Sequence, residues 1–489
     1  MKKLILFFVL FANILFGQKQ PDSRWIMGIQ SADTTEPGHH NIVMRFEPNG
    51  IEIDSVNLNM NFESTVATAT DSSGKLLFYT NGCEIRNGDG TLMLNGSDIN
   101  PGKLHDWVCD KGYTMPKAAM ALQMPGSKNK WVLIHSGGSY DPYRKVIYGP
   151  LYYSIISMNT STQKGIVGAK NVALLGGDLE PFSVVRHGNG RDWWVVVPRH
   201  GSNQYYLWVL GPNGFSAPKT RNIGTAAKCR RTGSSAFSLD GTKYARRNSC
   251  MTTVLDFDRC TGLLTNPLNF DARENPTFGG GGVAFSKDKR WLYASAQLSL
   301  YSVDLESPNP TLDTAYNWQY YLGVSLGYFQ TGPDNQIYIG FMHRENSLSV
   351  LADPSQYGDS LDYQNAKIKF PVPVVRTIPH FPNYRLFDKQ GSLCDTLNIN
   401  TATTEIEKEE NLFTISPNPA NTELEISTKQ IAYGNEVQIY NAIGTAVLTQ
   451  NLTSEKTTLD VSQLPPGMYF YAIISDNKRL QSGKLVVQR

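Results

Sequence analysis

The sequence predicts an all-β chain: a seven-bladed β-propeller followed by a small Ig-like β-sandwich. A hairpin pattern, in which two short runs of β-branched and aromatic residues flank a polar turn, occurs six times. The turns lie roughly 46 to 62 residues apart, which is the spacing of propeller blades with some long loops. The chain is 11% aromatic, has 42 Gly and 26 Pro, and shows no long run with the period of a helix.

The clearest hairpin is Gly282–Ser295, in which Val283–Phe285 and Trp291–Ala294 flank the turn. The other five hairpins have the same form and are Thr65–Thr80, Met120–Ile134, Phe182–Val197, Ser235–Ala245 and Tyr328–Gly340. A lone hairpin cannot bury enough surface to be stable in water, whereas four-stranded units arranged radially cover one another. Further strand-like runs follow the hairpins, for example Thr253–Phe257 and Leu264–Phe270, so four strands per blade are expected.

Closure of the ring is expected to join the two ends of the domain. Trp25–Ile29, Asn41–Phe46 and Ile51–Val56 are three strand-like runs before the first hairpin. Phe381–Phe387 offers one more strand after the last hairpin. Three strands from the front and one from the back would complete a seventh blade, so we expect a propeller over about residues 24–390. Six blades is the alternative.

The N-terminus predicts export. Lys2 and Lys3 precede the apolar run Leu4–Phe16, which is too short to span a membrane and ends at Gly17. We therefore expect a signal peptide at 1–17 and no transmembrane segment. Gln18 rather than a cysteine would follow, so no lipid anchor is expected. The net charge of +2 says nothing about nucleic acid, and no block of basic residues supports such a partner, so none is expected.

Six cysteines in an exported chain predict disulfides, although the sequence alone allows fifteen pairings. In a propeller, the B–C and D–A loops share one face because the strands of a blade alternate in direction. That geometry favours the pairs Cys83–Cys109 and Cys229–Cys250. Cys260 lies in a C–D turn, about a strand length (~20 Å) from Cys250, which leaves Cys394 as its candidate partner.

The last fifth of the chain has a different character. Residues 391–411 are rich in Asn and Thr and include the charged run Glu405–Glu410, as expected of a linker. Residues 412–489 contain seven short strand-like runs. Alternation is clear in Glu436–Tyr440, which suits a small sandwich with one buried face per sheet.

Four motifs of this tail carry a resemblance: Ser416-Pro-Asn-Pro-Ala420, Tyr440-Asn-Ala-Ile-Gly444, Leu464-Pro-Pro-Gly-Met-Tyr-Phe470 and Gly483-Lys-Leu-Val-Val-Gln-Arg489. In this order they resemble the type A C-terminal sorting domain of the type IX secretion system of Bacteroidota. The resemblance implies passage through the periplasm, recognition by the outer-membrane translocon, removal of the tail, and a product that is secreted or held at the outer-membrane surface. An ordinary Ig-like binding domain is the alternative. The residues expected to carry the sorting signal are Pro417, Asn418, Pro419, Tyr440, Asn441, Gly444, Pro466, Gly467, Tyr469 and Lys484.

The central region is similar to secreted propellers of the same bacteria, which share phrases such as Leu77–Gly82 and Phe257–Gly262. That resemblance comes without an assigned activity. The sequence also predicts no catalytic residue, metal site or cofactor. Ser238-Leu-Asp-Gly-Thr places its glycine one position too early for a sialidase-type Asp box, and no Gly-x-Ser-x-Gly motif is present. His39 and His40 have no further ligand at metal-site spacing nearby.

One pattern emerges when the loops are sorted by face. The face with the B–C and D–A loops is expected to gather basic and aromatic side chains, with few carboxylates besides Asp141 and Glu345. These candidate binding residues are His135, Tyr143, Arg144, Arg199, His200, Arg230, Arg231, Arg247, His343 and Arg344.

Arginine forks suit carboxylate, sulfate or phosphate groups, and tyrosine faces suit sugar rings. We therefore expect a non-enzymatic protein that binds an anionic glycan or a surface protein. The alternative is that these arginines only solvate the loops and bind no ligand. A polysaccharide lyase or hydrolase is the functional alternative, with His135, Tyr143 and His200 as its candidate residues.

Overall fold

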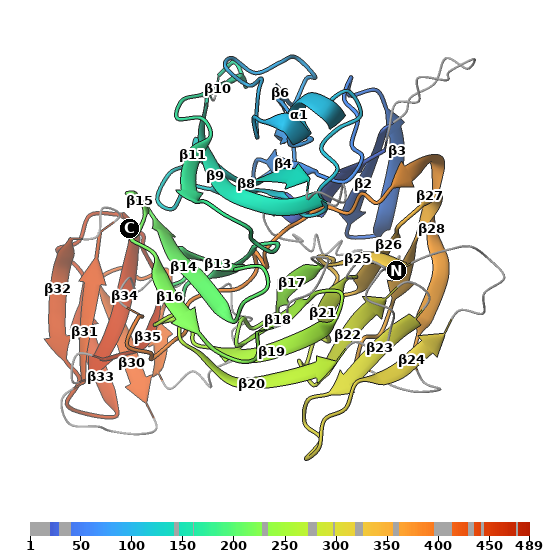
Figure 1. The fold of residues 1–489 in the computed structure, drawn as a ribbon. Coiled ribbons are helices and arrows are strands. Elements are labelled where there is room, and N and C mark those ends of the chain that lie inside the picture. Colours follow the sequence, from blue (N-terminus) through green and yellow to red (C-terminus); the bar gives the residue numbers. More distant parts are fainter. Residues whose placement is uncertain are drawn as a thin grey trace, which may run out of the picture. The chain divides into compact units, whose positions relative to one another are not determined.

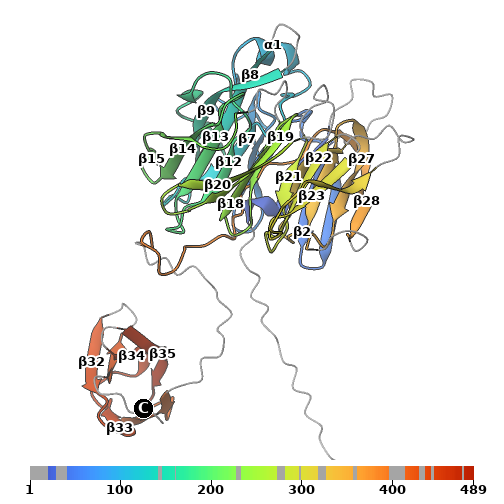
Figure 2. The ribbon, with the colours of Figure 1, turned by 60° about the horizontal axis from the view of Figure 1, so that its bottom comes forward.

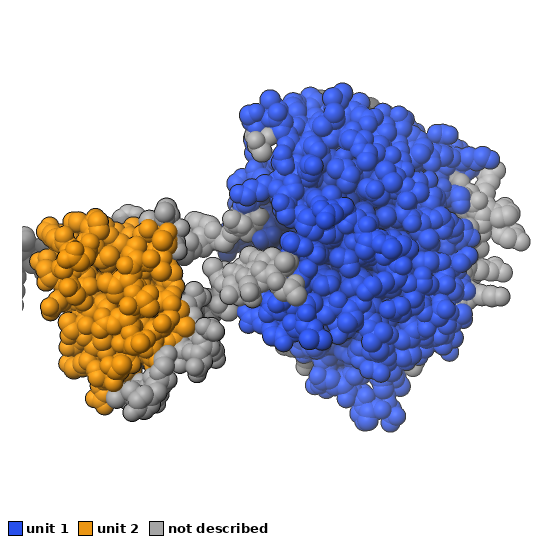
Figure 3. All heavy atoms as spheres, turned by 90° about the vertical axis from the view of Figure 1, so that its left-hand side faces the viewer, with its two compact units in different colours: residues 1–400 blue, residues 401–489 orange. Residues whose placement is uncertain are grey.

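The computed structural model describes residues 20–28, 41–140, 146–159, 161–226, 233–271, 281–296, 299–317, 326–355, 361–395, 413–428, 435–441, 445–475 and 478–489. The chain divides into two compact units, residues 1–400 and 401–489, and each is described by itself (Figure 3). The signal peptide expected at 1–17 lies outside the described residues. No helix among the described residues is long and apolar enough to cross a membrane.

The described part of unit 1 forms seven antiparallel sheets arranged in a ring (Figure 1). The first two are β1 (Arg24–Met27), β2 (Asn41–Glu47), β3 (Gly50–Val56), and β4 (Ala67–Thr70), β5 (Leu76–Thr80), β6 (Ile85–Asn87). The next two are β7 (Ala119–Gln123), β8 (Lys130–Tyr140), β9 (Val146–Met158), β10 (Gly165–Val167), β11 (Val172–Leu175), and β12 (Ser183–Arg186), β13 (Trp193–Pro198), β14 (Gln204–Gly211), β15 (Gly214–Phe215), β16 (Lys219–Asn222).

The last three sheets each have four strands in sequence order. They are β17 (Ser234–Phe237), β18 (Lys243–Arg247), β19 (Met251–Phe257), β20 (Leu264–Asp271); β21 (Val283–Phe285), β22 (Trp291–Ala296), β23 (Ser299–Asp304), β24 (Asp313–Asn317); and β25 (Leu326–Thr331), β26 (Ile337–Phe341), β27 (Arg344–Leu351), β28 (Tyr363–Val375). Two short helices complete the unit, η1 (Pro21–Ser23) and α1 (Lys103–Val108).

All six expected hairpins are present as the inner strand pairs β4–β5, β7–β8, β12–β13, β17–β18, β21–β22 and β25–β26. The inner strands are apolar on both sides because neighbouring blades cover both faces; every residue of β13 is buried. We call the face with the A–B and C–D turns the turn face, and the face with the B–C and D–A loops the loop face.

The ring is closed by packing of the last sheet on the first. The Tyr338 ring of β26 lies 5.1 Å from the Trp25 ring of β1 and 5.5 Å from the Phe46 ring of β2, both edge-on. Buried aromatic contacts of this kind hold two sheets together without sharing backbone hydrogen bonds. The expected seven-bladed ring is confirmed.

The expected closing strand at Phe381–Phe387 is wrong. The first sheet has only β1, β2 and β3. No backbone hydrogen bond joins β1 to residues 377–387 among the described residues. Pro379 and Pro382 lack the N–H groups that a strand ladder needs. The hydrogen bonds of this stretch therefore go to separate partners in several blades.

We call Thr377–Asp395 the closing segment. Figure 1 shows the orange chain that follows β28 crossing the middle of the ring. The Thr377 hydroxyl donates to the carbonyl of Phe62 (2.6 Å), and the Tyr384 hydroxyl donates to that of Ala121 (2.9 Å). Arg385 then forms a bidentate pair with Asp22, at 2.6 and 3.0 Å. The end of the domain is thus tied to its beginning by side chains rather than by a strand ladder.

Disulfides add covalent links within unit 1. Cys83–Cys109 is formed as expected, with a Cα–Cα distance of 5.7 Å. Cys260 pairs with Cys394, at 5.4 Å between Cα atoms. Cys250 is disulfide-bonded, and its expected partner Cys229 lies outside the described residues.

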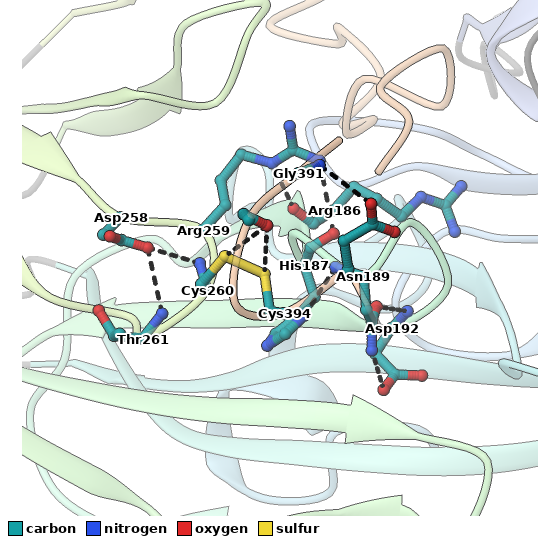
Figure 4. Close-up of a disulfide and its surroundings, with 12 residues drawn as sticks. Arg186, His187, Asn189, Asp192, Asp258, Arg259, Cys260, Thr261, Gly391 and Cys394 are labelled. Atoms are coloured by element: carbon teal, nitrogen blue, oxygen red, sulfur yellow. Dashed lines mark hydrogen bonds between the residues drawn. A yellow bond between two sulfur atoms is a disulfide. The ribbon is translucent and has the colours of Figure 1, made fainter. Parts of the chain in front are cut away.

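Figure 4 shows the Cys260–Cys394 bond between the turn that carries Asp258 and Thr261 and the end of the closing segment. The Lys389 amide donates to the Gly188 carbonyl (2.7 Å), and the Gly391 amide donates to the Asp395 carboxylate (3.0 Å). The expected linker at 391–411 therefore starts too early, because its first five residues are attached to the ring.

Unit 2 is a sandwich of a three-stranded and a four-stranded sheet (Figure 2). The sheets contain β29 (Phe413–Ser416), β30 (Glu423–Thr428), β33 (Lys456–Asp460), and β32 (Ala446–Asn451), β31 (Asn435–Tyr440), β34 (Gly467–Ser475), β35 (Lys478–Val487). Val437 and Ile439 are buried while their neighbours are half-buried, as the alternation indicated. All seven expected strands are present.

Candidate functional site

His135 does not belong to a surface site. Its side chain is fully buried, with Nδ1 2.6 Å from Asn100 Oδ1 and Nε2 3.0 Å from Ser154 Oγ. Burial lowers the pKa of the imidazole to about 3, so the ring is neutral. The sequence placed His135 in a loop, but β8 continues through it to Tyr140.

Arg247 is also misplaced by the sequence interpretation. Only 2% of the residue is exposed, and its guanidinium donates to the Ser295 carbonyl (2.9 Å) and to Thr252 Oγ1 (2.7 Å). It joins the blade of β17–β20 to the blade of β21–β24, which is a structural role.

The remaining candidates divide into two groups. Arg199 and His343 are exposed and His200 is half-buried, all in loops between second and third strands, on the loop face. Tyr143, Arg144, Arg230 and Arg231 lie outside the described residues, as does the side chain of Arg344. Whether the other eight residues share one binding site therefore stays a prediction.

The structure adds a polar cluster that the sequence did not reveal. Glu180 precedes β12, and its amide donates to the Pro198 carbonyl (2.9 Å). Its carboxylate lies 3.7 Å from Arg246 NH1 and 3.8 Å from His200 Nδ1, and it accepts from Asn248 Nδ2 at 3.3 Å. The Arg246 guanidinium lies 5.0 Å from the Tyr205 ring centroid. We call these five residues the Glu180 cluster.

Several polar atoms of the Glu180 cluster are buried without a hydrogen-bond partner in the described structure. They are Arg246 Nε and NH1, His200 Nδ1 and the Tyr205 hydroxyl oxygen. Glu180 and Arg246 are each 2% exposed. An unsatisfied buried polar group costs about 1–3 kcal/mol, so these atoms need partners from outside the described side chains.

Burial and neighbouring groups shift the pKa values of two members of the Glu180 cluster, Arg246 and Tyr205. Burial opposes the charge on Arg246, but the Glu180 carboxylate and the Tyr205 and Tyr244 hydroxyls outweigh it, so the pKa of the guanidinium is raised. Burial raises the pKa of Tyr205 to about 12. A charged guanidinium and a protonated phenol together suit recognition of polar groups.

Glu180 was not predicted from the sequence because its partners are distant in the chain. His200 lies 20 residues further along and Arg246 lies 66 residues further along. The only local signal was Asp178-Leu179-Glu180 immediately before an apolar strand. Glu180 is buried and Asp178 is exposed on the same loop face, so this face is less purely basic than expected.

One further cluster has metal-site spacing. Ligand atoms of Cys83, His105 and Cys109 lie within 4.8 Å of one another. The two sulfur atoms are bonded to each other, so they present no thiolates to a metal.

The sorting motifs of unit 2 are joined by hydrogen bonds. The Asn418 amide donates to the Lys484 carbonyl (2.8 Å), and Asn418 Oδ1 accepts from the Val486 amide (2.9 Å). The first motif is thereby attached to the last strand, β35.

The other motif residues hold turns or lie exposed. Asn441 Oδ1 accepts from the Thr445 amide (2.9 Å), and the Tyr469 hydroxyl donates to the Pro465 carbonyl (2.8 Å). The Tyr440 hydroxyl donates to Gln438. Gly444 lies outside the described residues, while the exposed members are Pro417, Pro419, Pro466, Gly467 and Lys484.

Residues 414–488 match the model of the Por_Secre_tail family, the secretion system C-terminal sorting domain. No curated protein sequence matches the chain. Proteins with this domain are exported by the type IX secretion system to the cell surface or the medium, and the domain implies engagement of that system. The resemblance of the tail is confirmed.

Solved structures with propeller-type folds are similar to the chain at low identity. A candidate 6-phosphogluconolactonase from Bacteroides fragilis has 12% identity over 73% of this chain and 98% of its own, with a TM-score of 0.38. PorZ, an essential surface component of the type IX system of Porphyromonas gingivalis, has 12% identity over 95% and 58%, with a TM-score of 0.25. The Dos1 propeller has 12% identity over 69% and 75%, with a TM-score of 0.34. None of these scores supports an argument about activity, and the propeller assignment rests on the sheet topology.

Proposed function

We propose that this exported propeller binds an anionic glycan at the loop face without transforming it. The observation that carries the proposal is the Glu180 cluster, in which guanidinium and imidazole nitrogens are buried without hydrogen-bond partners in the described structure. A hydroxyl-rich ligand offers acceptors to these nitrogens and donors to the carboxylate.

Neighbouring surface groups support the choice of an anionic ligand. Leu179, next to Glu180, forms a backbone bridge with Arg199, whose exposed guanidinium contacts Gln204 Oε1 at 3.4 Å. The same amide oxygen accepts from the Tyr206 hydroxyl (2.6 Å). An arginine and a tyrosine at the edge of a polar cluster supply the charge-assisted and ring-face contacts that acidic sugars use.

The protonation of Tyr205 supports binding rather than catalysis by that residue. Burial raises the pKa of its hydroxyl to about 12, which keeps its proton in place at neutral pH. A general acid or base works best with a pKa near the operating pH.

Arg199→Glu in the full secreted protein tests the proposal, with binding to a panel of acidic and neutral polysaccharides as the readout. We expect at least one acidic polysaccharide to bind, and Arg199→Glu to weaken that binding at least tenfold because charge reversal replaces attraction with repulsion. Lys287→Glu is the matched control, since Lys287 is exposed in the turn between β21 and β22, on the turn face. Equal binding by both variants, or capture of a surface protein but no polysaccharide, would overturn the glycan assignment.

A polysaccharide lyase or hydrolase is the second candidate. The observation that favours it is the half-exposed His200 next to a carboxylate, an arrangement used in proton transfer. Incubation of the protein with each polysaccharide that binds, followed by absorbance at 235 nm and a reducing-end assay, separates the two functions. Product formation that is lost in His200→Gln would establish the enzyme and contradict the binding proposal.

A further inference from the structure

The centre of the ring contains a cavity of ≈ 110 Å³ that the Glu180 cluster does not reach. Its walls are the inner strands β7, β12, β17, β21 and β25, the closing segment, and Asp22 and Lys117. Half-buried residues of the turn face, among them Leu239, Asn335 and Asn383, line its rim. A cavity needs roughly 10–15 Å³ of such volume per water molecule, so this one has room for a small organic molecule.

Lys117 is the unusual group in this wall. The residue is 4% exposed. Within the described residues its ammonium has neither an ion pair nor a hydrogen bond, and burial alone lowers its pKa to about 7. Buried lysines are rarely left unpaired because a charged ammonium in an apolar interior is costly.

The other charged groups that face the cavity are already neutralised. Arg385 forms its bidentate pair with Asp22, whose pKa is raised by burial although Arg385 opposes the shift. The His380 Nδ1 donates to the Lys117 carbonyl (3.1 Å), and burial together with the Lys117 charge lowers the pKa of the imidazole well below its usual value. When Lys117 is protonated, its ammonium is therefore the one positive charge without a partner among the described lining residues.

The rest of the lining is mixed. Ser183 and Ser235 bring hydroxyls, with 2.8 Å between their oxygens, and Met120, Val184 and Phe329 bring apolar surface. A ligand that matches has one negative charge, a few polar groups and a short carbon skeleton.

We propose that the central cavity binds a small monocarboxylate, whose carboxylate pairs with the Lys117 ammonium. The site is separate from the loop face and does not rest on the glycan proposal. A phosphate or sulfate dianion fits less well, because one ammonium balances only one charge and no free guanidinium among the described lining residues supplies a second.

Thermal unfolding of the full secreted protein tests the site, with acetate, lactate and sodium sulfate as probes and sodium chloride at matched ionic strength as reference. At least one carboxylate should raise Tm of the wild type at pH 6.5, and by less at pH 8.5, where more of the free Lys117 is neutral. Calorimetry at pH 8 in two buffers of different ionisation enthalpy should show proton uptake on binding, since the bound anion restores the lysine charge.

Lys117→Met removes the charge while keeping the length of the side chain, and Lys128→Met, at an exposed turn position, is its control. We expect the carboxylate-dependent rise in Tm to vanish in Lys117→Met and to persist in Lys128→Met. No effect of either carboxylate beyond chloride, an equal effect in both variants, or stabilisation by sulfate alone would overturn the proposal.

Discussion

At the scale of one residue, the burial of Lys117 changes its pKa and thereby the pH dependence of stability. The ordinary pKa of a lysine is 10.5, and burial brings that of Lys117 to about 7. Between these two pH values the unfolded chain holds one proton more than the folded chain. The free energy of unfolding therefore rises with pH through this window, by about 1.4 kcal/mol per pH unit for this group. Below about pH 7 both states are protonated, and the full cost is present.

Lys117→Met should therefore stabilise the protein at pH 7 without added carboxylate, by a few kcal/mol (up to ~5). The gain should shrink toward zero as the pH approaches 10.5, because the unfolded wild type then loses its proton too. Guanidinium unfolding of wild type, Lys117→Met and Lys128→Met at several pH values measures it. A variant that is less stable than wild type at pH 7 would mean that the ammonium has a partner after all.

Individual site residues were the part that the sequence predicted least well. The motif residues of the tail were found because they form a contiguous pattern with local partners, as Asn441 has in Thr445. His135, Arg247 and Glu180 were misjudged or missed, since the burial of a polar residue depends on neighbours from other blades. Glu180, for example, is paired with Arg246, which belongs to the next blade.

At the scale of elements, hairpins were predictable and the closing segment was not. Each hairpin is encoded by two short runs and one turn, so its signal is local. The closing segment looked like a strand because Phe381, Tyr384 and Phe387 are aromatic. Two of these, Phe381 and Tyr384, are buried by several blades instead of by one partner strand, which no local pattern reveals.

The Cys260–Cys394 bond should contribute more to stability than the Cys83–Cys109 bond. It spans 134 residues, whereas Cys83–Cys109 spans 26. Loop-closure entropy grows with the length of chain enclosed, so replacing both Cys260 and Cys394 by serine should cost about 3–5 kcal/mol of unfolding free energy. The Cys83→Ser/Cys109→Ser protein should lose less.

Guanidinium unfolding of the two serine variants gives the comparison, with limited proteolysis to locate any released chain. Cleavage between 386 and 395 should appear only in the Cys260→Ser/Cys394→Ser protein. Equal losses in the two variants, or an unchanged cleavage pattern, would argue that the closing segment is held by its hydrogen bonds alone.

At the scale of the molecule, unit 1 is a ring of blades that are not stable alone, and the last residues of the domain help to close it. The sorting sandwich follows in the sequence as a separate unit. The blade number followed from the repeat spacing and the three strands before the first hairpin. The mode of closure did not, because the bonds of Thr377, Tyr384 and Arg385 reach partners 263 to 363 residues away. Contacts over such separations leave no periodic trace in a sequence.

The central claim is that residues 377–395 stabilise the ring closure beyond the packing of β26 on β1 and β2, and truncation tests it most directly. Two chains are compared by guanidinium unfolding: residues 18–395 with Cys260→Ser and Cys394→Ser, and residues 18–376 with Cys260→Ser, so that neither has the disulfide. Burial of Ile378, Phe381 and Tyr384 contributes roughly 1.5–3 kcal/mol for each side chain. The longer chain should unfold in one cooperative transition, and the shorter chain should be unfolded or less stable by several kcal/mol. Identical midpoints for the two chains would contradict the account.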